Sequence, residues 1–121
     1  MASNAIAAID PRALRDAAGC FATGVTIVTT LGEAGEPVGL TANSFTSVSL
    51  DPPLVLWSLA KTSRAAAAFT AADHFAIHVL ADDQQELAQR FASAVPDRFA
   101  GLEQGSGAGG VPVLPGCGVR L

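Results

Sequence analysis

Residues 39–53 read GLTANSFTSVSLDPP, a run of small and hydroxyl-bearing residues inside an otherwise apolar sequence. The segments on either side, 25–31 and 54–59, are mostly apolar or β-branched and are expected to form strands of the core. Polar side chains between core strands need hydrogen-bond partners, because an unpaired buried hydroxyl or amide costs about 1–3 kcal/mol. Either the protein's own turns or a bound ligand could supply these partners.

Composition and charge limit the kinds of partner. The 121 residues carry seven Lys and Arg against eleven Asp and Glu, a formal net charge of −4, and half of them are hydrophobic. Such a chain is expected to form one globular domain over residues 1–121, with residues 1–9 as a flexible start. Seven scattered basic residues do not make the cationic surface that nucleic acids and anionic membranes select. The sequence therefore favours a small ligand or another protein.

Targeting signals and cysteine usage indicate the compartment. No apolar run approaches the roughly 18 residues that a membrane span needs, and residues 1–9 have no basic cluster of the kind that opens a secretory signal. The two cysteines, Cys20 and Cys117, match no metal-binding or redox spacing and are expected to be free buried thiols. A cytoplasmic protein is predicted.

The usual catalytic constellations are weak. His74 and His78 lie four residues apart, and on a strand this spacing separates them by about 13 Å, too far to share a metal ion without a third element. No Gly-x-Ser-x-Gly elbow is present. The sequence therefore predicts no metal site and assigns no catalytic residue.

The pattern along the chain indicates an α+β protein built mainly on an antiparallel sheet or barrel. Asp10 and Pro11 are typical of a helix start, and Leu14, Ala17, Ala18 and Phe21 would form its apolar face. A turn at 32–36 should join two strands, and no GxGxxG follows a strand, so a doubly wound fold is less favoured. The expected helices run from Asp10 to a stop at Gly24, over 65–69, and from 82 to before Pro96. The expected strands are 25–31, 37–41, 54–59, 74–80, 111–114 and 117–121, and 105–110 is expected to be a flexible Gly-rich loop.

The lack of side-chain catalysts is compatible with cofactor chemistry. In hydride transfer a bound flavin supplies the reactive group itself. The protein then needs to provide only hydrogen-bond donors to the flavin phosphate and ribityl chain and a flat apolar slot for the ring. Ser63 beside Lys61 and Arg64 would suit the phosphate. The alternative from the residues alone is that the hydroxyls of 39–53 cap turns.

Five segments, in order along the chain, carry a resemblance to a known family. They are 21–30 (FATGVTIVTT), 39–55, 60–64 (AKTSR), 75–80 (FAIHVL) and 87–92 (LAQRFA). Together they resemble the short-chain flavin reductases, the NAD(P)H-dependent components that supply reduced flavin to two-component monooxygenases. The resemblance covers nearly the whole chain from Phe21 onward.

The resemblance implies an FMN-binding split β-barrel with short helices, a homodimer, FMN or FAD as the flavin, and NADH or NADPH as co-substrate. It also implies a flavin-dependent monooxygenase as the partner that receives reduced flavin. Carried over by position, the resemblance implies two groups of flavin contacts. The ring and ribityl chain would lie against Thr41, Ala42, Asn43, Ser44, Ser47, Val48 and Ser49, and the phosphate would lie by Ala60, Lys61, Ser63 and Arg64.

Two departures from the family pattern stand out. Family members often carry Asn where this chain has His78, which we expect on the non-core face of its strand. Family domains also continue beyond Leu121 with further strands and a Gly-Asp-His motif, and this sequence has no such motif. The chain is expected to lack the last strands of the domain, either as a truncated piece of such a reductase or as a shortened member that covers the gap by oligomerising. The alternative function is accordingly a flavin-binding or dimerisation module with little reductase activity.

Overall fold

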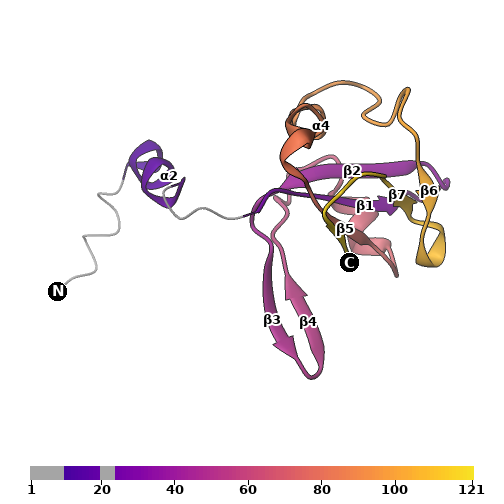
Figure 1. Ribbon diagram of the computed structural model, residues 1–121, viewed down its shortest axis with the longest axis horizontal. Coiled ribbons are helices and arrows are strands. Elements are labelled where there is room, and N and C mark those ends of the chain that lie inside the picture. Colours follow the sequence, from indigo (N-terminus) through magenta and orange to yellow (C-terminus); the bar gives the residue numbers. More distant parts are fainter. Residues whose placement is uncertain (1–9, 20–23) are drawn as a thin grey trace.

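The computed structural model describes residues 10–19 and 24–121; Cys20, Phe21 and residues 1–9 lie outside this part of the chain. Its core is a four-stranded sheet with the order β2-β1-β5-β8, and two further pairs, β3-β4 and β6-β7, are separate (Figure 1). Every pairing is antiparallel, which confirms the expected antiparallel sheets with a few short helices. In chain order the elements are α2 (Pro11–Gly19), β1 (Thr26–Leu31), β2 (Pro37–Ala42), β3 (Thr46–Leu50), β4 (Pro53–Leu56), α3 (Ala66–Ala71), β5 (Ala76–Val79), η1 (Asp82–Gln84), α4 (Gln85–Ala92), β6 (Gly105–Ser106), η2 (Ala108–Gly110), β7 (Pro112–Val113) and β8 (Val119–Arg120).

The central strand β1 is buried on both faces. Its neighbouring side chains Ile27 and Val28 point to opposite faces, as alternation along a strand requires. The buried threonines satisfy their hydroxyls on carbonyls outside the strand: Thr26 donates to Ala42 at 2.6 Å and Thr29 to Pro112 at 2.6 Å. The strand therefore uses β-branched residues for packing and their hydroxyls to tie other segments to the sheet.

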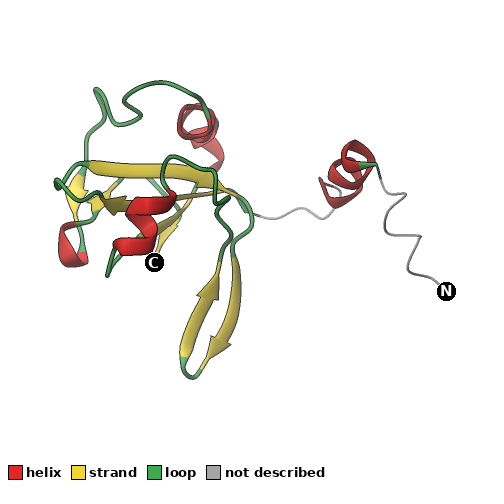
Figure 2. Cartoon of the chain, turned by 180° about the vertical axis from the view of Figure 1, so that it is seen from behind, coloured by secondary structure: helices red, strands yellow, loops and turns green. Residues whose placement is uncertain are grey.

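The two faces of the sheet carry two different cores. Ile27 packs with Phe91, Phe99 and Leu114 on the face that α4 covers. Val28 packs with Ala42 and Ile77 on the other face, where Phe45, Trp57 and Phe69 close the layer, the last of them from α3 (Figure 2). The two short helices therefore cover opposite faces.

The predicted helix after residue 82 is confirmed, with a different first turn. Residues 82–84 form the 3₁₀ turn η1, and the Gln84 side chain accepts a hydrogen bond from the Ala81 N–H at 2.8 Å. Helix α4 then ends at Ala92, before Pro96. Its last turn places Phe91, which is fully buried, on the sheet.

The opening helix α2 begins as predicted, because the Asp10 carboxylate accepts a hydrogen bond from the Arg12 N–H at 3.2 Å. Its apolar face is not buried as expected: residues 11–18 are exposed, and Leu14 is 57% exposed. Amphipathic spacing shows which face a helix can bury but not whether a partner covers it.

The prediction for His78 is wrong. The imidazole is fully buried instead of lying on a non-core face, because β5 is covered on both sides. Its Nε2 accepts a hydrogen bond from the Leu114 N–H at 3.1 Å, so its Nδ1 carries the proton and donates to the Ile27 carbonyl at 3.0 Å. A neutral histidine thus links β1 and β5 to the segment after β7.

The Gly-rich segment 105–110 is also more ordered than predicted. Strand β6 pairs with β7, and the Gly107 N–H donates to the Val111 carbonyl at 2.8 Å. Gly109 turns the chain at φ +66°, a conformation that L side chains rarely adopt. The glycines here build a tight hairpin instead of a flexible loop.

The strand predicted at 54–59 forms only as far as Leu56, as β4, and it lies outside the core. The β3-β4 hairpin projects from the four-stranded sheet in both views (Figure 1, Figure 2). Its large apolar side chains are at least two-fifths exposed: Val48, Leu50, Leu54, Val55 and Leu56. An isolated two-stranded hairpin is only marginally stable in water, and the rest of the described chain leaves the apolar side chains of this one exposed.

Burial of His78 predicts a pH-dependent stability. Burial lowers the pKa of His78 below its usual 6.5, the hydrogen bond to Ile27 opposes this change, and Arg120 adds to the lowering. The unfolded chain therefore binds a proton that the folded chain resists, so stability falls as the pH drops from 6.5 toward the folded pKa, by at most about 1.4 kcal/mol per pH unit. Urea unfolding between pH 7.5 and 5.5 measures this loss. His78→Gln should remove it, and an equal slope in that variant would contradict the assignment.

Candidate functional site

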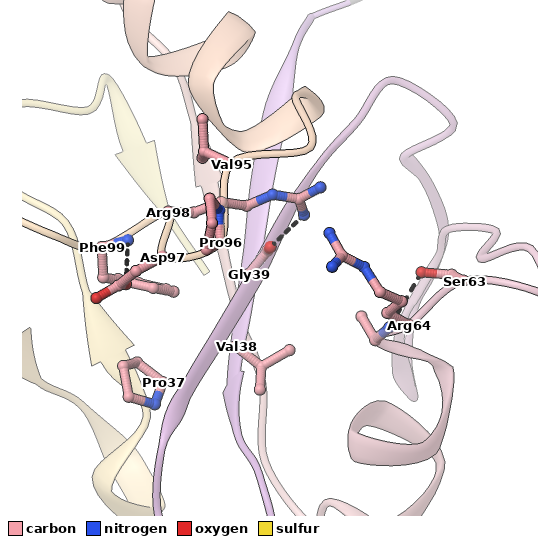
Figure 3. A pocket seen from close by; sticks show the side chains of 11 residues that line it. Pro37, Val38, Gly39, Ser63, Arg64, Val95, Pro96, Asp97, Arg98 and Phe99 are labelled. Atoms are coloured by element: carbon pink, nitrogen blue, oxygen red, sulfur yellow. Dashed lines mark hydrogen bonds between the residues drawn. The ribbon is translucent and has the colours of Figure 1, made fainter.

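A pocket of about 250 Å³ lies where three segments meet: the first half of β2, the turn before α3, and the loop after α4 (Figure 3). None of the three segments adjoins another in the sequence. The lining residues are Pro37, Val38, Gly39, Ser63, Arg64, Ala65, Val95, Pro96, Asp97, Arg98 and Phe99.

Arg98 is held rigidly in this pocket. Its guanidinium donates to the Gly39 carbonyl from Nη1 at 2.9 Å and to the Ser93 carbonyl from Nε at 3.1 Å and Nη2 at 2.7 Å. These bonds use three of its five N–H groups and leave one on each terminal nitrogen. The side chain therefore bridges β2 and the end of α4 while keeping two donors for another acceptor.

Arg64 reaches into the pocket from the opposite side, and the two guanidinium groups point toward one another (Figure 3). Among the described residues no carboxylate pairs with either group. Burial lowers the pKa of Arg98, and the positive charge of Arg64 lowers it further. Two facing cations without a counter-charge make a site that an anion would stabilise.

The acidic residue at the pocket does not neutralise the arginines. The Asp97 carboxylate accepts a hydrogen bond from the Phe99 N–H at 3.0 Å, and in Figure 3 it points away from both guanidinium groups. Arg90 on α4 donates to the Arg98 carbonyl at 2.7 Å and to the carbonyl of Ala100. The loop that carries Arg98 is thereby fixed to the helix.

Gly39 joins the core to the pocket. A Cβ atom at this position would lie 2.9 Å from the Phe91 ring and 3.0 Å from the Phe99 ring, so only glycine allows this edge-to-face ring pair to pack on β2. The same residue supplies the carbonyl that Arg98 binds. Core packing at Gly39 therefore sets the position of the guanidinium.

Of the eleven residues that the family resemblance implies, two line this pocket: Ser63 and Arg64. Ser63 also caps the turn before α3, since its hydroxyl accepts a hydrogen bond from the Ala65 N–H at 3.2 Å. The Ser63 hydroxyl therefore caps a turn, which was the alternative left open by the sequence, and the same residue also lines the pocket. Ala60 and Lys61 lie exposed in the same turn.

The other residues lie on β2, β3 and the segment between them. The Thr41 hydroxyl donates to the Ala88 carbonyl at 2.6 Å, and Ala42 is only 7% exposed, so contact with a ligand would involve its backbone. The Ser44 hydroxyl accepts from the Ser58 N–H at 2.9 Å. Asn43 is exposed between the strands, and Ser47, Val48 and Ser49 lie in β3 at its bulge.

Arg98 is the pocket residue that sequence reasoning missed. It lies 34 positions after Arg64 (98 minus 64) in a segment read only as one further turn after the helix. The local signal was weak: Arg98 directly follows Pro96-Asp97, where a helix has ended and a side chain is free to contact another segment. Nothing local connects that residue to β2, because the connection is the Gly39 carbonyl.

Other side-chain chemistry is sparse in the described part of the chain. It contains no group of three His, Cys, Asp or Glu residues that could hold a metal ion. Cys117 is a free thiol and is half-buried, less than expected. No helix among these residues is long and apolar enough to cross a membrane.

The pocket of this small antiparallel β protein brings together Arg64, from the serine-bearing turn before α3, and Arg98, from the loop after α4, and two such cations suit an anionic group. Comparison with known proteins makes this specific. Residues 18–121 match the family model described as a flavin reductase like domain, and the chain belongs to that family.

Three relatives illustrate the match. The chain is 53% identical over 110 residues to the FMN reductase (NADH) SmoA of Agrobacterium fabrum, covering 91% of this chain and 62% of that protein. It is 48% identical over 109 residues to the flavin-dependent monooxygenase reductase subunit HsaB of Rhodococcus jostii, covering 90% and 55%. The structure of the NADH:FAD oxidoreductase SgcE6 of Streptomyces globisporus with NAD and FAD fragments superposes with a TM-score of 0.79 at 39% identity, covering 93% and 70%. The chain thus spans less than two thirds of the two curated relatives.

Proposed function

We propose that this chain is the flavin-reducing domain of an NADH-dependent flavin reductase. The observation that carries the proposal is the facing pair Arg64 and Arg98, which has no carboxylate partner among the described residues and lies beside Ser63. A flavin phosphate supplies the missing negative charge. The names of the relatives SmoA and SgcE6, an FMN reductase (NADH) and an NADH:FAD oxidoreductase, support the choice of cofactor and co-substrate.

In this proposal, the flavin phosphate would be held by Ser63, Arg64 and Arg98. The ribityl chain and ring of the flavin would contact the polar segment after β2. A bound flavin supplies a ring that accepts hydride from the reduced nicotinamide. The chain's own residues bind and orient it, with no side-chain acid or base assigned. The proposed contacts along the ring and ribityl chain are Thr41, Ala42 (through its backbone), Asn43, Ser44, Ser47, Val48, Ser49, Ala60 and Lys61.

The partner in this proposal is a flavin-dependent monooxygenase that receives reduced flavin, as the name of the relative HsaB supports. Use of NADH fits a cytoplasmic location. We further propose that residues 1–121 belong to one domain and that its strands are part of a split β-barrel, as the family resemblance implies.

The exposed β3-β4 hairpin supports a homodimer as the assembly. From Asn43 to Ala60 the only charged residue is Asp51, so a second copy could cover the ribbon while each copy buries at most one charge. The apolar side chains on both faces of the hairpin are the kind that homodimer interfaces bury. A second copy of this chain is therefore the proposed cover.

The proposed activity is tested by mixing the purified chain with FMN and NADH under anaerobic conditions and following the bleaching of the flavin. We expect FMN to bind and NADH to be consumed with it. Binding without NADH oxidation would favour the alternative of a flavin-binding module. No binding of any flavin would contradict the proposal.

A further inference from the structure

A closed ring of hydrogen bonds holds the loop that follows α4. The Arg90 guanidinium donates from Nε to the Arg98 carbonyl at 2.7 Å. The Arg98 guanidinium donates to the Ser93 carbonyl from Nε at 3.1 Å and from Nη2 at 2.7 Å. The Ser93 hydroxyl donates to the Arg90 carbonyl at 2.7 Å and closes the ring. Each of these three residues therefore donates to one of the other two and accepts from the remaining one.

The two arginines of the ring hold different parts of the structure. Arg90 binds only backbone, because it also donates from Nη2 to the Ala100 carbonyl, and it lies outside the lining of the pocket. Arg98 lines the pocket, donates to the Gly39 carbonyl at 2.9 Å, and points toward Arg64 (Figure 3). Arg90 thus fixes the main chain of the residue whose side chain faces the pocket.

The carbonyl that Arg90 binds lies where the exposed part of the loop meets the core. Residues 94–97 are exposed, whereas the ring of Phe99 is buried. Because a peptide unit is planar, the direction of the Arg98 carbonyl fixes the backbone angle ψ of Arg98. The backbone angles in turn limit the rotamers that the Arg98 side chain can adopt. The bond from Arg90 therefore helps to set the direction of the Arg98 guanidinium.

We propose that Arg90 is a positioning residue for flavin binding, which acts without touching the ligand by holding the Arg98 peptide so that the Arg98 guanidinium faces the pocket. The inference rests on the proposed function, which puts the flavin phosphate at Arg98, and adds a residue from outside the pocket to it. The planar guanidinium of Arg90 suits this role because it binds two carbonyls in a fixed geometry.

The test is a double-mutant cycle in which flavin fluorescence gives the dissociation constant for FMN. Arg90→Lys keeps the positive charge but loses the planar fork, and we expect it to weaken FMN binding by about three- to tenfold, within the range of couplings inside one hydrogen-bond network. When Arg98→Met is already present, Arg90→Lys should cause no further loss, because no guanidinium is left to position.

Arg120→Lys is the matched control, since it makes the same change on β8, outside the lining of this pocket, and should bind FMN as the unmodified chain does. Riboflavin has no phosphate and should bind equally to Arg90→Lys and to the unmodified chain. A general loss of structure would weaken the binding of both flavins, so this comparison separates positioning of Arg98 from a merely structural role of Arg90.

A spectroscopic signature tests the positioning without any ligand, and also if Arg98→Met does not fold. The Nε–H group of Arg98 is held on the Ser93 carbonyl, so its nitrogen-15 NMR signal should exchange slowly with water. Arg90→Lys should speed this exchange, and Arg120→Lys should not.

The outcomes separate this inference from the proposed function. Unchanged FMN affinity in Arg90→Lys, a loss that persists in full beside Arg98→Met, or an unchanged exchange rate of the Arg98 Nε–H would overturn the positioning role and leave flavin reduction standing. If the unmodified chain binds no flavin, the proposed function fails, and the Nε–H signal still decides whether Arg90 holds Arg98.

Discussion

Phe91→Ala is expected to lower the free energy of unfolding by about 3–5 kcal/mol, the usual cost of removing a buried phenylalanine. Phe91 is fully buried, meets Phe99 edge to face at a centroid distance of 5.0 Å, and packs against Gly39. Because a domain of this size is typically stable by only about 5–15 kcal/mol, the variant should be close to unfolding.

Urea unfolding followed by circular dichroism measures this loss. Leu14→Ala serves as the control, because Leu14 is 57% exposed on α2, outside the proposed dimer interface, and its truncation should change the stability by no more than about 0.5 kcal/mol. If Phe91→Ala cost as little as the control, the core around α4 would be wrongly described. Phe91→Ala should also weaken FMN binding, because loss of the ring would displace Gly39 and, with it, Arg98.

Leu50→Lys combined with Leu56→Lys is expected to convert the proposed homodimer into a monomer. The pairing register of β3 and β4 places these two residues on opposite faces of the hairpin, so a partner on either face would have to bury an unpaired ammonium group. Both side chains are already exposed, at 94% and 55%, and the fold of one copy should therefore tolerate the change.

Light scattering after gel filtration should give twice the monomer mass of 12.2 kDa for the unmodified chain and the monomer mass for the double variant. A matched variant with Gln89→Lys and Gln104→Lys adds the same charge at exposed positions of α4 and the following loop and should remain dimeric. A monomeric unmodified chain, or a double variant that stays dimeric, would contradict the proposed interface.

Local signals in the sequence were enough for most of the sheet. β1 and β2 were predicted because β-branched residues and a five-residue turn between them are short-range features, and Gly35 at φ +80° makes that turn. Helix α4 was predicted from its spacing and from Pro96. These elements depend on neighbours in the sequence more than on the rest of the fold.

The errors occur where distant segments decide the environment. Alternation in 74–80 indicated a half-buried strand, but the segment after β7 covers the second face and buries His78. Glycine content in 105–110 indicated flexibility, yet pairing with β7 turns the same residues into a hairpin. Neither covering segment can be recognised from the local pattern.

The candidate site likewise contains residues that the local sequence predicts and one that depends on tertiary packing. Ser63 and Arg64 lie within one conspicuous segment and could be predicted from it with the family resemblance. Arg98 belongs to the pocket only because α4 and Gly39 bring its loop to β2. Half of the cationic site is thus a product of tertiary packing.

A crystal structure of the chain with FMN tests the central claim most directly. The account predicts that the phosphate lies within hydrogen-bonding distance of the guanidinium groups of both Arg64 and Arg98, beside Ser63. A phosphate bound away from these arginines, with the pocket between β2 and the loop after α4 left without ligand, would contradict it.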